Sequence, residues 1–191
     1  MKKFLTLRNI VLCCGALLLL VAFFLSFAAS VKVFDSGVDG VFKNAIWGCR
    51  EVQLPDQVIS IGVIFGTEKV GPAVLPFLGV LFMLLAALGA ILVALLVKKP
   101  WAKWVVVGLA VLAIAGAVFQ FFIYTQLLRA GVNASVKEGL VEKSYADDFY
   151  QTLKTHFDKG NPRFAVSVVM GMLGILGGLA VGASQLLPEK K

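Results

Sequence analysis

Four long stretches of this chain contain no charged residue and no histidine. They cover residues 10–30, 73–97, 104–128 and 164–187. A helix that crosses a bilayer needs about 20 mainly apolar residues, and 59% hydrophobic against 15% charged residues is unusual for a soluble domain. The sequence therefore predicts an all-α membrane protein, a four-transmembrane-helix bundle that forms a single integral membrane domain over residues 1–191.

A short basic segment separates the second stretch from the third. Lys98, Lys99 and Lys103 surround Pro100, and proline disfavours helix at the residue before it. Two antiparallel spans are therefore expected to meet at a turn here. Because lysine and arginine next to a span favour the cytoplasmic side, this turn and both termini are predicted to be cytoplasmic.

The distribution of the net charge of +7 along the chain agrees with this topology. The outer segments, residues 31–72 and 129–163, contain equal numbers of basic and acidic residues, and the cytoplasmic segments contain Glu189 as their one acidic residue. The excess of positive charge is thus explained by the positive-inside bias, and no nucleic-acid partner is expected. Eight basic residues lie in the cytoplasmic segments: Lys2, Lys3, Arg8, Lys98, Lys99, Lys103, Lys190 and Lys191.

The first apolar stretch has two interpretations. The small residues Ala28, Ala29 and Ser30 could form the cleavage site of a secretory signal. The stretch is as long as a full span, which favours a retained helix. With the opening Met1-Lys2-Lys3 and the short loops, the retained helix predicts a multi-pass protein of the plasma membrane, of the bacterial inner-membrane type, surrounded by membrane lipids.

The first outer segment, residues 31–72, is rich in β-branched and aromatic residues between turn signals. In its run 58–65, alternate residues from Ile59 to Phe65 share one face of an extended strand. This pattern predicts a small antiparallel sheet. An irregular loop with a few extended residues is the alternative.

The second outer segment, residues 129–163, has the pattern of an amphipathic helix. Ser144 and Asp147 have the spacing of a helix start, and Gly160 begins a stop signal. With Trp47 and Cys49 of the first outer segment, the apolar face of this helix is the candidate outer contact surface. That face is predicted to contain Tyr145, Phe149, Leu153 and Phe157.

Glycines recur at every fourth position of the last apolar stretch, at Gly174, Gly178 and Gly182. Small residues let helix backbones approach closely in a membrane. They therefore predict a seam of helix packing within the bundle. The alternative is a seam for a second copy of the chain or for a partner helix.

Residues that could act in catalysis, bind a metal or form a disulfide are scarce. His156 is the one histidine and Cys49 the one outer cysteine, so neither a paired-histidine metal site nor a disulfide within the outer segments is expected. The spans contain no ionisable residue of the kind that proton-coupled transport uses. The sequence accordingly predicts no catalytic residue, no cofactor and no metal, and a protein that is not an enzyme.

The order of these elements resembles the plan of claudins and peripheral myelin proteins. The resemblance depends on four spans, a β-rich first outer segment with Trp47-Gly48-Cys49, and a helical second one. That family has two cysteines in its first outer loop, and here Cys49 is alone. The family also has an arginine at the entrance to its second span, where this chain has Pro72-Ala73. We therefore do not assign the chain to it.

Two functions from different classes fit the sequence. The leading hypothesis is a non-catalytic structural or accessory subunit that contacts a membrane-protein partner or a second copy of itself through its outer segments, because binding surfaces concentrate on such connections. The alternative is a channel or carrier for a small neutral or lipid-like solute.

Overall fold

The computed structural model describes residues 6–35, 38–96 and 101–187 of the chain. It is mostly helical, with a small antiparallel sheet. Its contacts group into two compact units. Unit 1 consists of Met1–Leu25, Leu78–Gln120 and Val169–Lys191, and unit 2 consists of Ser26–Phe77 and Phe121–Val168. The single domain over residues 1–191 stays a prediction.

Four helical segments are long and apolar enough to cross a membrane. They coincide with the four uncharged stretches to within a few residues, except at the end of the third. Lys98, Lys99 and Pro100 of the predicted cytoplasmic turn lie outside the described residues. The helices are α1 (Leu7–Leu25), α3 (Val74–Leu96), α4 (Ala102–Phe119), which continues through a 3-10 turn into α5 (Ile123–Lys137), and α7 (Ala165–Ala183).

The third segment is longer than the sequence predicts. It runs over Ala102–Lys137, a length of 36 residues, whereas the uncharged stretch ends at Leu128 because Arg129 follows. Beyond that point one face remains apolar or small, and Gly131, Val132 and Ser135 are buried at helical spacing. An amphipathic continuation of this kind is missed when a span is defined by the absence of charge.

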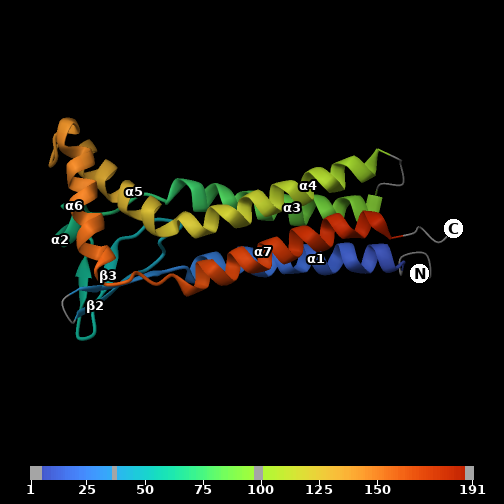
Figure 1. Ribbon diagram of the computed structural model, residues 1–191, viewed down its shortest axis with the longest axis horizontal. Coiled ribbons are helices and arrows are strands. Elements are labelled where there is room, and N and C mark those ends of the chain that lie inside the picture. Colours follow the sequence, from blue (N-terminus) through green and yellow to red (C-terminus); the bar gives the residue numbers. More distant parts are fainter. Residues whose placement is uncertain (1–5, 36–37, 97–100, 188–191) are drawn as a thin grey trace. The chain divides into compact units, whose positions relative to one another are not determined.

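In unit 1 the helices pack through small residues. Helices α3 and α4 are antiparallel neighbours, because Gly79 lies against Gly116 and Gly89 against Leu109. Helix α7 contacts α1, where a Cβ on Gly177 would lie 2.9 Å from Leu19 Cγ. Figure 1 shows α1 beside α7 and α3 beside α4. Close backbone approach of this kind is the expected packing where lipid supplies no hydrophobic driving force between helices.

In unit 2 four short strands form one antiparallel sheet, with the order β1-β2-β3-β4. The predicted small sheet is therefore confirmed. Lys32 of the first strand also exchanges two backbone hydrogen bonds of 2.7 Å with Arg163, which precedes α7. The strands are β1 (Val31–Asp35), β2 (Val38–Phe42), β3 (Glu51–Gln53) and β4 (Val58–Ser60).

The strand predicted over residues 58–65 is wrong in its second half. The chain leaves the sheet after Ser60, whose side-chain oxygen accepts a hydrogen bond of 3.2 Å from the Gly62 N–H. A single helical turn, α2 (Gly62–Phe65), follows and ends at Gly66, which has a φ of 71°. Ile61 and Phe65 are both buried. Residues four apart share a face in a helix as well as in a strand, so the alternation did not distinguish the two.

The predicted amphipathic helix of the second outer segment is confirmed as α6 (Ala146–Asp158), but its start differs. Ser144 does not cap the helix, because its hydroxyl lies 3.4 Å from the Glu142 carboxylate. Tyr145 precedes the helix and is exposed, whereas Tyr150 is buried. The buried face therefore includes Tyr150 and excludes Tyr145.

Candidate functional site

Trp47 lies at the centre of an aromatic cluster within unit 2. Its indole N–H donates a hydrogen bond of 3.0 Å to the Ser26 hydroxyl. Its ring stacks on Phe27, with centroids 5.0 Å apart, and meets the edge of Phe77 at 5.3 Å. These contacts place Trp47, predicted to belong to an outer contact surface, in a half-buried packing position where it fixes the chain between β2 and β3.

Cys49 is buried two residues further on. Its backbone forms a bridge with Val70, and its thiol donates a hydrogen bond of 3.2 Å to the Glu51 carbonyl. Burial raises the pKa of the Cys49 thiol to about 11. A buried thiol with a raised pKa is a poor nucleophile, so Cys49 is a packing residue in this structure and does not lie on an outer surface.

Cys49 should react with a maleimide only after unit 2 opens. In a background of Cys13→Ala and Cys14→Ala it is the one cysteine left of the three. A pKa of about 11 instead of 9.0 lowers the thiolate fraction at pH 8 by ~100-fold, and burial adds to this protection. Mass spectrometry should find native protein unlabelled and protein in dodecyl sulfate fully labelled. Complete native labelling within minutes would contradict the buried position.

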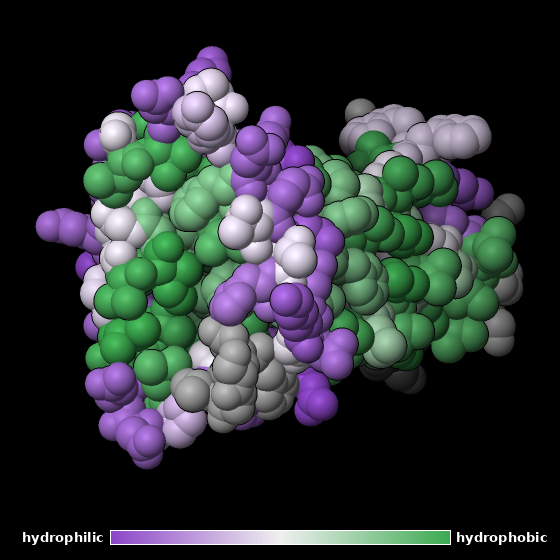
Figure 2. All heavy atoms as spheres, turned by 60° about the vertical axis from the view of Figure 1, so that its left-hand side comes forward, coloured by the Kyte–Doolittle hydropathy of each residue, from purple (hydrophilic) through white to green (hydrophobic). Residues whose placement is uncertain are grey.

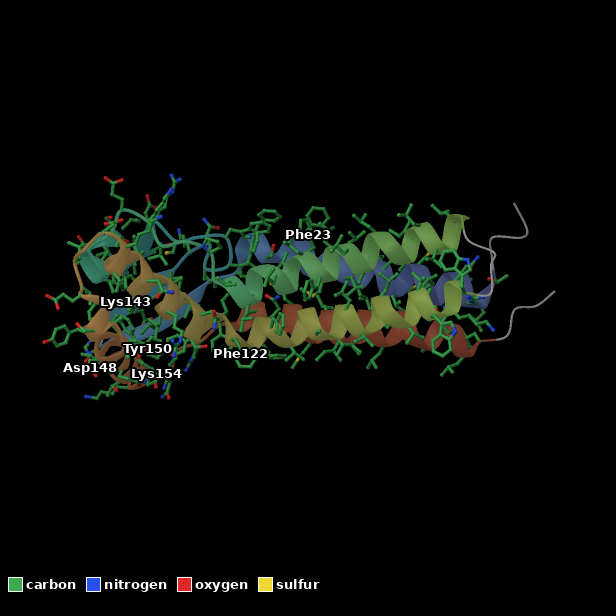
Figure 3. The ribbon with its side chains drawn as sticks, turned by 90° about the horizontal axis from the view of Figure 1, so that it is seen from above. Phe23, Phe122, Lys143, Asp148, Tyr150 and Lys154 are labelled. Carbon is green, nitrogen blue, oxygen red and sulfur yellow. The ribbon has the colours of Figure 1, made fainter. Side chains whose placement is uncertain are left out.

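Helix α6 is held against α5 by polar contacts as well as apolar ones. The Asp158 carboxylate accepts hydrogen bonds of 2.9 Å from the Tyr124 hydroxyl and 2.7 Å from the Lys154 ammonium group. The guanidinium of Arg129 lies 4.6 Å from the centre of the Tyr150 ring. Figure 3 labels Tyr150 and Lys154, one turn apart on α6.

These contacts shift the pKa of the Asp158 carboxyl group. The hydrogen bond from Lys154 outweighs partial burial and lowers the pKa of Asp158 below its ordinary value of 3.8. A carboxyl whose pKa is lower in the folded state contributes to folding above its unfolded-state pKa. The contribution of Asp158 is therefore present at neutral pH and is lost in strong acid, as the pH falls through its lowered pKa.

An apolar cavity of about 410 Å³ lies between the sheet and α6 in unit 2. Leu153 and Phe157 line it from α6, so these two members of the predicted contact surface point inward. His156 also lines it and is the one polar side chain among ten lining residues. The sheet, its loops and α2 supply the others: Val33, Gly40, Phe42, Val52, Leu54, Ile59 and Ile64.

A different set of residues presents apolar side chains outward. Val58, Val63 and Leu140 of unit 2 are each more than half exposed, and Leu140 packs beside Gly66 at the end of α2. Figure 2 shows hydrophobic side chains gathered on the forward face of this unit, bordered by hydrophilic ones. The sequence prediction missed this surface because it assigned Val63 to a strand and left Leu140 unassigned.

The three glycines of the predicted series in α7 lie against α4 within unit 1. A Cβ on Gly174 would approach Ala117 and Met83, and one on Gly178 would approach Ile114 and Ala110. Gly182 lies beside Ala110 with more room, since the nearest atom would be 3.4 Å away. These contacts support the helix-packing interpretation of the glycine series.

The described residues contain no group of three or more His, Cys, Asp or Glu side chains that could hold a metal ion. Comparisons with protein-family models, curated proteins and solved structures found no match for this chain. The fold therefore defines only a structural class. The protein is mostly helical, with four helices long and apolar enough to cross a bilayer and a small antiparallel sheet.

Proposed function

We propose that this chain is a non-catalytic multi-pass protein of the bacterial inner membrane, with both termini in the cytoplasm. Four apolar helices support the membrane assignment. Large apolar side chains such as Leu85, Leu88 and Leu92 of α3 are exposed on unit 1, as expected for a surface that faces lipid. The concentration of basic residues in the predicted cytoplasmic segments supports the orientation.

Within that membrane protein, unit 2 serves as a recognition module for a protein, either a membrane-protein partner or a second copy of the chain. The observation that carries this proposal is the exposure of three large apolar side chains of unit 2, which make up its exposed apolar surface: Val58, Val63 and Leu140 are each more than half exposed. Contiguous exposed apolar surface bordered by polar residues marks interaction sites in many proteins. A structural or accessory subunit would use such a surface to hold its companion.

The interior of unit 1 favours this role over that of a channel or carrier. Among its described residues, the buried side chains are apolar apart from Gln120 and Ser184. Gln120 donates a hydrogen bond of 3.2 Å to the Gly116 carbonyl of its own helix, and Ser184 donates one of 2.6 Å to the Val181 carbonyl. Both side chains bond to their own helix, so neither supplies a continuous polar path.

The recognition role predicts that charge on the exposed apolar surface releases the companion. Val63→Glu and Leu140→Glu should each remove a stoichiometric companion, or the dimer band, from protein extracted in polymer-bounded lipid discs. The reason is that a carboxylate buried at an interface without a partner is strongly unfavourable. Cross-linking followed by mass spectrometry and by mass photometry measures the loss and separates a partner from a second copy.

Lys137→Glu is the matched control, because Lys137 is an exposed residue of α5 and is not part of the apolar surface. It should retain the companion. Slow labelling of Cys49 in each variant shows that unit 2 remains folded. A wild-type protein that is extracted as a monomer without a companion would overturn the proposal.

A further inference from the structure

The apolar cavity between the sheet and α6 has a polar end. His156 borders this cavity and also a second hollow of about 430 Å³ on the flank of α6. The second hollow is shallow and open, is lined by hydrophilic residues and includes the ammonium-bearing Lys159. At the His156 imidazole, the apolar cavity thus adjoins this second hollow, which forms a shelf of hydrophilic and cationic side chains. The other residues of the shelf are Gln151, Thr152 and Thr155.

We propose that the cavity binds the hydrocarbon chain of a long-chain fatty acid, with the carboxylate at His156 and Lys159. The chain would lie against Leu153, Phe157 and Ile59, and the carboxylate would accept hydrogen bonds from the shelf. This inference does not depend on the partner contact proposed above, because the exposed surface at Val63 and the cavity lining are different residues.

The composition of the lining selects this ligand class. A volume of about 410 Å³ lies within the range of small-molecule sites. Apart from His156, no side chain of the lining can form a hydrogen bond, so a sugar or nucleotide would lose its bonds to water without replacement. A hydrocarbon chain loses nothing there and gains by leaving water.

The charges near the shelf select an anionic head group. Lys159 is exposed and is the one Lys, Arg, Asp or Glu side chain among the five residues that line the shelf. The nearest carboxylate in sequence, Asp158, accepts hydrogen bonds from Tyr124 and Lys154. Its charge is therefore partly compensated, and the shelf remains suited to a carboxylate.

The test uses the full chain in phosphatidylcholine nanodiscs and a palmitate that carries a photoreactive diazirine on its chain. Cross-links should appear in peptides of α6 and of the sheet, and unlabelled palmitate should compete with them saturably. Labelling of the lipid-facing spans should not saturate. Across a series from octanoate to palmitate, affinity should rise by up to about fourfold for each added methylene, and hexadecanol should compete more weakly than palmitate.

Two variants alter the cavity by different means. Gly40→Leu fills it, since a Cβ at Gly40 has only ordinary contacts, 3.5 Å from Val52 and 3.9 Å from Leu54. Leu153→Gln places an amide against the chain and should weaken binding by about tenfold or more. If Gly40→Leu exposes Cys49 to labelling and has therefore unfolded unit 2, Leu153→Gln alone decides the question.

Lys159→Gln tests the head group. It should weaken palmitate binding by about two- to fivefold, the range of an exposed ion pair, and should leave hexadecanol unaffected. Lys137→Gln, a charge-matched change outside the shelf, should alter neither. Cross-links that do not saturate, or that persist in both cavity variants, would overturn the proposal. A lysophospholipid that competes better than palmitate would overturn the assignment to a fatty acid.

Discussion

Replacing Gly116 by leucine should prevent α3 and α4 from packing in unit 1. A Cβ at this position would lie 2.5 Å from the Gly79 carbonyl oxygen and 3.0 Å from Phe82 Cβ. The obstruction is backbone of the neighbouring helix, which no rotamer change can relieve. Even Gly116→Ala should cost about 1–3 kcal/mol, as overpacking of a core does, and the leucine variant should lower the yield of monodisperse protein several-fold.

The matched control is Gly108→Leu in the same helix. A Cβ at Gly108 would meet nothing within 4 Å, and leucine has a higher helix propensity than glycine by about 1 kcal/mol. This variant should therefore be at least as stable as wild type. Size-exclusion chromatography after a temperature ramp measures the difference in detergent. Equal melting temperatures for the Gly116 and Gly108 variants would contradict the close approach of α3 and α4.

The contrast between these glycines shows what spacing reveals and what it does not. The glycine spacing of the last apolar stretch predicted a seam of close packing, and Gly174 and Gly178 do lie against α4. The same reasoning could not separate Gly116 from Gly108, because both are small residues in one apolar helix. Which of them meets a neighbour depends on the rotation of α4 about its axis, and that is set by all of its contacts together.

The four long apolar helices were predictable because an uncharged apolar stretch of membrane length strongly indicates a helix of that length. The sheet was predictable from β-branched residues between turn signals, but its last strand was not. There, Ser60 and Gly66 start and stop a helical turn, and a pattern of period two overlaps a helical one at Ile61 and Phe65. Local hydrogen bonds decided between the two structures.

The candidate outer contact surface was the least predictable feature. Trp47, Cys49 and Phe157 are apolar residues in outer segments, and the sequence alone does not distinguish apolar residues that fill a small core from those that face a partner. The structure places all three in the packing of unit 2. Unit 2 therefore has a core of its own.

Phe65→Ala should destabilise the core of unit 2. The Phe65 side chain is 2% exposed, its ring lies directly against Gly131 of α5, and it approaches the Phe42 ring with centroids 6.5 Å apart. Its carbonyl also accepts a hydrogen bond of 2.6 Å from the Ser135 hydroxyl. Removing a buried phenylalanine ring costs about 3–5 kcal/mol, so the opened form of unit 2 should become ~150-fold to ~5,000-fold more populated.

The Cys49 thiol provides the measurement, because it reacts only in the opened form. In the Cys13→Ala and Cys14→Ala background, Phe65→Ala should raise the maleimide labelling rate by the same factor as the opened population, provided that reclosing is faster than labelling. Val63→Ala is the control. Val63 lies on the same helical turn but is 73% exposed, so this substitution should change the free energy of unfolding of unit 2 by less than about 0.5 kcal/mol. If both variants labelled at the wild-type rate, Phe65 could not be a core residue of the unit that buries Cys49, and the shared core of the sheet, α2 and α5 would have to be abandoned.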